Sequence, residues 1–255
     1  MLTRINPSLF KTLINMKKRH YLSALVGAFF VLITLPVLAQ DVPARAATVD
    51  KIHGGALGDD AKVAIAKELA NPIANLVSVP FQYNYSRGVG ANQGGSEQTL
   101  LFQPVIPFSL GGGDNFILRP IVTGARETNV NGFSAYGIAN VTIESFYAPY
   151  TGSSWIWGVG PYAVSPSGNS GRFGSQQTGA GITGVVLNRH GPWTYGLLAY
   201  QSWSAGGNPT FGTQNNLYGQ PFVAYTNKDA WTFTLETQAQ YNYDAHRTTN
   251  PLYMG

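Results

Sequence analysis

Residues 230–244 read AWTFTLETQAQYNYD, and apolar and polar side chains alternate along them almost without error. A period of two predicts a β-strand with one apolar and one polar face. The apolar face carries Trp231, Phe233, Leu235, Ala239, Tyr241 and Tyr243. The polar face carries Thr232, Thr234, Glu236, Gln238, Gln240, Asn242 and Asp244.

The length of this strand and the aromatic rings at both its ends favour a membrane-spanning strand. Strands of soluble proteins are usually about 5–6 residues long. Trp231 and Tyr241 are separated by about 33 Å of chain at roughly 3.3 Å per residue. With a tilt of about 40°, that length spans about 25 Å, the height of the apolar band around an outer-membrane barrel. The rings would then lie at the two membrane interfaces.

The rest of the chain repeats this pattern, so we expect nine strands in all. The segment 178–188 is weakly patterned, and its faces cannot be assigned from the sequence. The expected strands are 76–87, 97–109, 115–126, 133–147, 155–165, 178–188, 193–204, 216–226 and 230–243.

Short and long connections alternate along the chain. The short ones read GGGDN, TGSS, RHGP and TNKD, and the long ones include GVGANQGGS, ETNVNG, PSGNSGRFGSQQ and AGGNPTFGTQNN. Outer-membrane barrels have short periplasmic turns and longer outer loops. Closure follows because a strand edge cannot remain unpaired in lipid. The sequence therefore predicts an all-β, antiparallel transmembrane outer-membrane β-barrel; a soluble periplasmic β-sandwich is the alternative.

The N-terminus has the layout of a secretory signal peptide. A basic region at 17–19 precedes an apolar run over 21–38, and cleavage is expected after the small residue Ala39. Met16 is a better-placed start than Met1. A single membrane-spanning helix is the alternative, but the apolar run is near the lower length limit for one.

A flexible lead and one short helix are expected between the signal peptide and the strands, over 40–75. Val63, Ala66 and Leu69 recur at helical spacing within 61–72. Either of two aspartates can cap this helix, Asp59 or Asp60. We expect it to pack against or cap the strands; the alternative is a plug or a periplasmic contact. The strands then occupy 76–244, and 245–255 form a tail.

The composition excludes several classes of protein. Only 11% of the residues are charged, against about 25% in typical soluble chains. Residues 1–39 hold five of the 16 basic residues and no acidic one, so the mature part has a net charge of −1 and no basic patch for nucleic acid. The absence of cysteine fits an exported bacterial chain.

No catalytic, metal or cofactor motif stands out. The mature part has three histidines, His53, His190 and His246, and none has a suitably spaced serine and acid on a shared face. There is no phosphate loop and no metal-ligand spacing. We therefore expect no enzyme, no metal and no cofactor.

Polar residues of inward parity are the candidates for lining a barrel interior. Any small barrel must fill its interior with side chains or water. These polar residues can therefore also line the interior without selecting a solute. Arg119 and Glu144 are the most specific candidates, because they lie on adjacent strands with inward parity and could form a charge contact across the lumen. The lumen candidates are Gln82, Asn84, Gln103, Arg119, Asn140, Glu144, Gln220, Glu236, Gln238 and Gln240. The candidate interface aromatics are Trp155, Trp157, Trp193, Trp203, Trp231, Tyr241 and Tyr243.

Several segments together carry a resemblance to a known family. They read AKELANPIANLVSVPFQYNY, LLFQPVIPFSL, SSWIWGVGPY, GPWTYG and QPFVAYTNKDAWTFTLETQAQYNYDA. Over about residues 61–246 the chain resembles outer-membrane transporters linked to the meta-pathway of phenol degradation. The resemblance implies a β-barrel of about twelve strands with a transport role, and it implies no substrate and no catalytic residues.

The end of the chain departs from that family. Family members look as if they continue with further strands, whereas this sequence stops at YDAHRTTNPLYMG, where Asn250-Pro251 interrupts any strand. The sequence therefore predicts a C-terminally truncated barrel.

The expected function is a transporter or channel for small molecules in the bacterial outer membrane, with aromatic or apolar solutes suggested by the resemblance alone. The alternative is a structural or adhesive surface barrel that acts through its outer loops. The expected partners are outer-membrane lipid, a small-molecule solute and the outer-membrane assembly machinery.

Overall fold

A computed structural model describes residues 58–166, 172–174, 176–211 and 213–255. The expected signal peptide and the lead as far as residue 57 lie outside these residues. The described chain is all-β, apart from the helix α2 (Asp59–Leu69) and a short 3₁₀ turn, η3 (Pro209–Phe211). No helix in this part of the chain is long and apolar enough to span a membrane.

The expected strands are present, and several are longer or more broken than the sequence suggested. The observed strands are β1 (Phe81–Val89), β2 (Gly95–Phe102), β3 (Ile106–Gly111), β4 (Asp114–Val130), β5 (Phe133–Ile138), β6 (Val141–Ala148), β7 (Trp155–Ser165), β8 (Gln177–His190), β9 (Trp193–Gly207), β10 (Asn216–Thr226), β11 (Thr232–Thr237), β12 (Ala239–Asn242), β13 (Arg247–Thr249) and β14 (Leu252–Met254).

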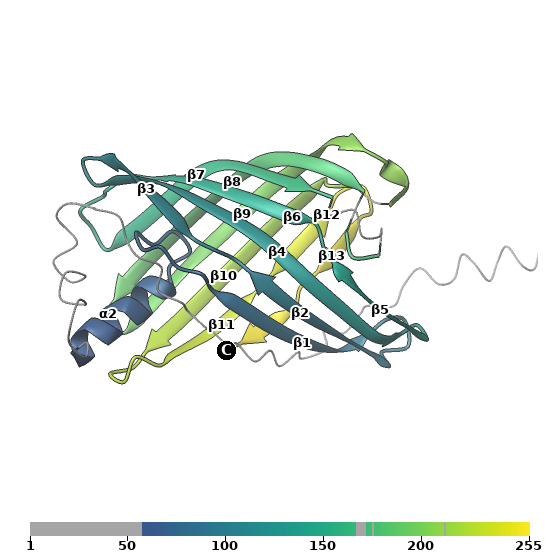
Figure 1. Cartoon of the computed structure of the whole chain (residues 1–255), viewed down its shortest axis with the longest axis horizontal. Helices are drawn as coiled ribbons and strands as arrows, with labels where there is room; N and C mark the ends of the chain where they lie inside the picture. The colour runs from purple at the N-terminus through teal and green to yellow at the C-terminus, as the bar shows by residue number, and fades with distance from the viewer. Residues whose placement is uncertain (1–57, 167–171, 175, 212) are drawn as a thin grey trace, which may run out of the picture.

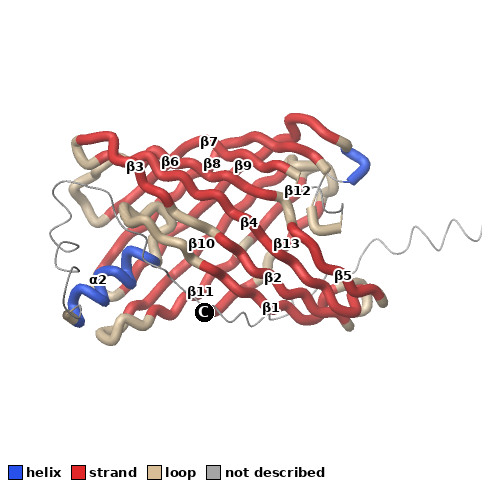
Figure 2. The backbone as a smooth tube through the Cα atoms, in the orientation of Figure 1, coloured by secondary structure: helices blue, strands red, loops and turns tan. Residues whose placement is uncertain are grey.

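All strands belong to one antiparallel sheet with nearest-neighbour connections. Its path runs β1-β2-β4-β6-β7-β8-β9-β10-β11-β14, while β3 and β5 extend β2 and β6 along β4, and β12 and β13 pair beside β10. The sheet curls into an incomplete barrel with strongly tilted strands (Figure 1). The tube view shows the same strands crossing in a front and a back layer around an interior (Figure 2).

The prediction of nine strands was wrong, because the tail 245–255 adds a tenth. β13 pairs with β12, and β14 pairs with β11, so the far edge of residues 232–242 is covered. Pro251 has no N–H to donate, yet its carbonyl oxygen accepts from the backbone N–H of Gln238. The proline therefore divides the tenth strand into two short pieces and does not end it.

The alternation of connections is only partly as predicted. The turns 112–113, 191–192 and 227–231 lie at one end, here called the short-turn end, and the long connections 166–176 and 208–215 lie at the other, the loop end. The expected long connection ETNVNG is instead a tight hairpin between β4 and β5. Asn131 and Gly132 both have positive φ there, the backbone that a two-residue β-hairpin requires.

The two faces of the sheet differ sharply in side-chain type. On β7, the side chains of Trp155, Trp157 and Val159 are exposed on the outer face, whereas Tyr162 and Val164 are buried on the inner face. On β8, the inner face carries Gln177, Thr183 and Val185 in the segment whose faces the sequence left unassigned. The outer face is thus apolar and the inner face mixed, with many polar groups.

Helix α2 and the segment after it lie at the short-turn end (Figure 1). The helix begins after Gly58, and neither aspartate caps it with its side chain, contrary to expectation. Asp59 and Asp60 occupy the first turn and Lys67 the last, where each charge complements the helix dipole. The segment 70–80 then carries Ile73 into the barrel interior.

Candidate functional site

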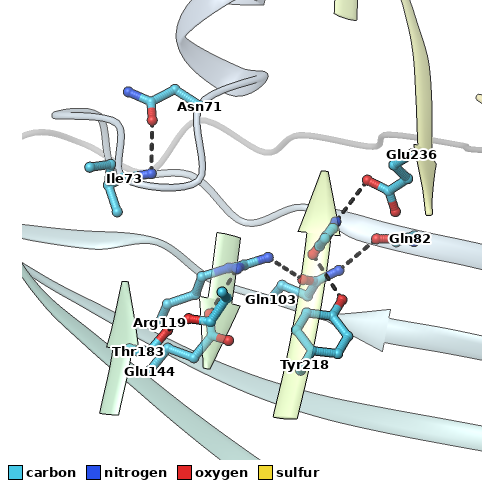
Figure 3. A network of polar contacts seen from close by, with 11 residues as sticks. Asn71, Ile73, Gln82, Gln103, Arg119, Glu144, Thr183, Tyr218 and Glu236 are labelled. Atoms are coloured by element: carbon cyan, nitrogen blue, oxygen red, sulfur yellow. Dashed lines mark hydrogen bonds and ion pairs between the residues drawn. The ribbon is translucent and has the colours of Figure 1, made fainter. Parts of the chain in front are cut away.

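One continuous run of hydrogen bonds crosses the inner face from β1 to β6. The amide of Gln82 donates to the Asn84 side chain at 3.0 Å and accepts from Gln103 at 2.9 Å. Arg119 donates to Gln103 Oε1 at 2.6 Å and to Glu144 Oε2 at 2.8 Å. Figure 3 shows Gln82, Gln103, Arg119 and Glu144 directed toward one another. We call this set the Arg119 network.

The ion pair at the end of this network is set by strand register. Arg119 on β4 lies directly opposite Glu144 on β6, so both side chains point inward. Their side chains are 13% and 4% exposed. The predicted contact is therefore made, between neighbouring strands rather than across the interior. Because both groups are buried, removing either one would leave an uncompensated charge.

A second polar set, the Glu236 set, lies on β10, β11 and the residue that follows β11. The Tyr218 hydroxyl donates to Gln220 at 3.0 Å, and Gln220 donates to Glu236 at 2.7 Å. Gln238 donates to the other carboxylate oxygen of Glu236 at 2.9 Å. Glu236 is 6% exposed. Its two oxygens are thus held by neutral amides and not by a cation.

Three stacked tyrosines lie between the two sets on the inner face. The rings of Tyr162 and Tyr200 have centroids 4.2 Å apart and an interplanar angle of 17°. Tyr200 and Tyr218 follow at 4.6 Å and 10°. The register places Gly181 of β8, the strand between those of Tyr162 and Tyr200, opposite Tyr162. The inward parity of these tyrosines was a signal that the sequence analysis did not use.

At the loop end, side chains from the connections meet the strands. Arg172 forms an ion pair with Glu127 on β4. Asp244, in the turn between β12 and β13, has its pKa lowered by hydrogen bonds from Thr213 and Asn215, and the charge of His246 contributes. These contacts draw the described parts of both long connections toward the strands.

At the short-turn end, the interior is filled by an apolar cluster around Ile73. Ile73 is 3% exposed, and its backbone N–H donates to the Asn71 side chain. Gly158 has no side chain and so leaves space for the terminal methyl group of Ile73. The other buried members are Val105, Ile117, Phe146, Ala148, Val185, Leu187 and Leu198. We call residues 70–80, which follow α2 and carry Ile73 into this cluster, the plug segment; α2 itself buries none of its residues, and the choice between a packing or capping helix and a plug stays a prediction.

The helix that precedes the plug segment is tied to the barrel by charge. Arg189 on β8 donates to both carboxylate oxygens of Glu68 on α2, at 2.7 and 2.9 Å. The sequence analysis missed this pair, because the two residues are far apart in the chain and no local pattern joins them.

The structure brings most of the predicted lumen candidates together in two hydrogen-bonded sets. The Arg119 network joins Gln82, Asn84, Gln103, Arg119 and Glu144, and the Glu236 set joins Gln220, Glu236 and Gln238. Asn140 lies beside Gly174 of a long connection, and Gln240 lies opposite Tyr218 in the register. Exposed outer-face rings are those of Trp155, Trp157, Trp193, Trp203, Trp231 and Tyr243, while Tyr241 is partly buried.

The arrangement suits binding or passage of polar groups and carries no catalytic constellation that we recognise. In the described ranges, no group of three His, Asp or Glu side chains is placed to hold a metal ion. No family model, curated protein or solved structure matches this chain.

Proposed function

We propose that this chain is a transmembrane β-barrel of the bacterial outer membrane that transports small solutes. One observation carries the proposal: the distribution of side chains is inverted relative to that of a soluble protein. Among the described residues, 27 large hydrophobic side chains are exposed, while 16 polar or charged residues are buried against 13 hydrophobic ones. Soluble monomers rarely expose one contiguous apolar surface of this kind.

The placement of exposed aromatic rings supports a membrane as the medium around the barrel. One belt lies near the short-turn end and comprises Phe108, Tyr147, Trp155, Trp193, Tyr225 and Trp231. A second lies near the loop end and comprises Phe133, Tyr136, Trp203 and Tyr243. Aromatic girdles at both interfaces flank the apolar band of outer-membrane barrels.

The polar interior supports a transport role. Transport also requires that the plug segment move. The Arg119 network and the Glu236 set offer donors and acceptors to a solute, whereas the cluster around Ile73 fills the short-turn end. Solute passage therefore needs displacement of residues 70–80. The resemblance to transporters linked to phenol degradation agrees with this role and stays a prediction, since no family model matches the chain.

The first experiment tests whether the protein is located in the outer membrane. The protein should co-fractionate with the outer membrane and resist carbonate extraction. A tag in the connection 208–215 should be reachable on whole cells, and a tag in the turn 227–229 only after permeabilisation. Recovery of a folded, soluble periplasmic protein would contradict the proposal.

Transport is tested next with the purified full chain in planar bilayers. Wild-type protein should show rare openings, and Arg189→Gln, which releases Glu68, should show more frequent ones. Lys62→Gln is the control, because Lys62 makes only an exposed contact within α2. A correctly inserted barrel without conductance in either form would favour the structural or adhesive alternative.

A further inference from the structure

The charges of the barrel interior are mostly cancelled by ion pairs. Arg119 pairs with Glu144, Arg172 with Glu127, and Arg189 with Glu68. Each pair joins side chains on different strands, connections or the helix, so opposite charges cancel locally within the interior.

Two carboxylates remain after this cancellation, Glu97 on β2 and Glu236 on β11. Ser86 lies opposite Glu97 on β1, and Glu127 lies opposite it on β4, so its nearest charged neighbour in the register is another acid. Like charges directly opposite each other destabilise a sheet. Glu236 is held only by the amides of Gln220 and Gln238.

Both carboxylates lie on the inner face, near the two edges of the incomplete barrel. Glu97 pairs in the register with Ser86 on β1, and Glu236 pairs with Tyr253 on β14; β1 and β14 are the two ends of the sheet. The two acids, although distant in sequence, therefore lie on the inner face one strand from each free edge of the sheet.

Among the described residues, no other charged side chain on the inner face balances them. Arg247 also has inward parity, because it lies opposite Asn242, but it is exposed at the loop end. The strand-linking residues outside the described ranges, 167–171, 175 and 212, are Ser, Gly and Asn and carry no charge. The inner face formed by the described strands thus keeps a net formal charge of −2 from Glu97 and Glu236.

We propose that this barrel selects cations over anions, so that its solutes are metal or organic ammonium cations or molecules with a cationic group. A narrow passage with low-dielectric walls focuses the field of uncompensated charges and raises the local concentration of counter-ions. Rings of acidic side chains select cations in channels by the same physics. This inference rests on the proposed transport function and adds the class of solute.

Reversal potentials of the purified full chain in planar bilayers, measured under a potassium chloride gradient, test the inference. Wild type is the reference for selectivity. The variant Arg189→Gln is not used in this experiment, because it leaves the negative charge of Glu68 uncompensated and would itself change the selectivity. Wild type should favour potassium over chloride. Glu236→Gln and Glu97→Gln should each lower the permeability ratio by about threefold, the effect of about one unit of thermal energy in the local potential. The double variant should lose the preference.

Two further variants separate charge from folding. Gln240→Glu adds an acid on the inner face opposite Tyr218 and should raise the ratio, a gain that misfolding cannot produce. Asp229→Asn, in an exposed turn at the short-turn end, should leave the ratio unchanged. Conductance without cation preference, or a preference unaffected by either carboxylate, would overturn the inference alone. Absence of all conductance from inserted protein would overturn the transport function and this inference with it.

Discussion

Leu197 and Leu198 are neighbours on β9, yet one is 42% exposed on the outer face and the other 2% exposed inside. Leu198 packs in the cluster around Ile73, whereas Leu197 belongs to the apolar outer surface. The same type of side chain thus serves two environments at neighbouring positions of one strand. The comparison teaches that the inner face is specified by contacts between side chains, while the outer face is specified mainly by being apolar.

The largest loss of stability is expected from removing one partner of a buried ion pair on the inner face. Arg119→Leu leaves Glu144 buried without its cation, which costs about 3–5 kcal/mol in comparable buried pairs. The free energy of unfolding in urea, measured from folded protein in vesicles, checks this value. Arg126→Leu is the control on the same strand, because Arg126 is exposed, and its change should stay within about 0.5 kcal/mol. Equal losses in both variants would contradict a specified inner face.

The outer face is tested by placing a charge on it. Leu197→Arg lies in the middle of β9 and should cost about 2–4 kcal/mol in a bilayer, against about 0–1 for Thr178→Arg near the loop end. On a water-exposed surface both substitutions would stay within about 0.5 kcal/mol. Urea unfolding from vesicles measures both variants. No difference between them would argue against a membrane around this face.

Substitutions of glycine compare crowded and open positions in the sheet, with a smaller expected loss of stability. A Cβ at Gly181 would overlap the carbonyl oxygen of Gln201, whereas a Cβ at Gly219 meets nothing within 4 Å. Gly181→Ala should therefore lower the free energy of unfolding by about 1–3 kcal/mol, as overpacking does. Gly219→Ala should be neutral or slightly stabilising. Thermal unfolding, followed as the loss of the folded band on a gel, ranks the two variants; the reverse order would contradict the packing described here.

The smallest effect is expected at the loop end, from Asp244. Its pKa is lowered in the folded state, mainly by the hydrogen bond from Thr213. The folded state thus favours the ionised form, so this stabilisation is present above the unfolded pKa of about 3.9. It is lost as the pH falls through the lower folded pKa. Asp244→Asn should unfold at a lower temperature than wild type at pH 7, and the gap should close in acid. A gap that persists at the lowest pH would contradict this origin.

Local alternation was enough to assign faces to most residues of the candidate site. It placed Gln82, Gln103, Arg119 and Glu144 inward, because side chains alternate across a strand whatever its partners are. It failed where local pattern was weak, as on β8, and where Pro251 suggested an end. There, pairing with β11 supplied hydrogen bonds that the sequence did not reveal.

The sequence by itself determined the strands, their two faces and the apolar character of the outer surface, since each depends only on neighbours along the chain. Only the tertiary structure decided which inward residues meet. The bidentate bond between Glu68 and Arg189, the stack of Tyr162 on Tyr200, and the lack of a cation at Glu236 all depend on register between distant segments. Register is fixed by the pairing of whole strands, because a slip of one residue would turn every inward side chain outward.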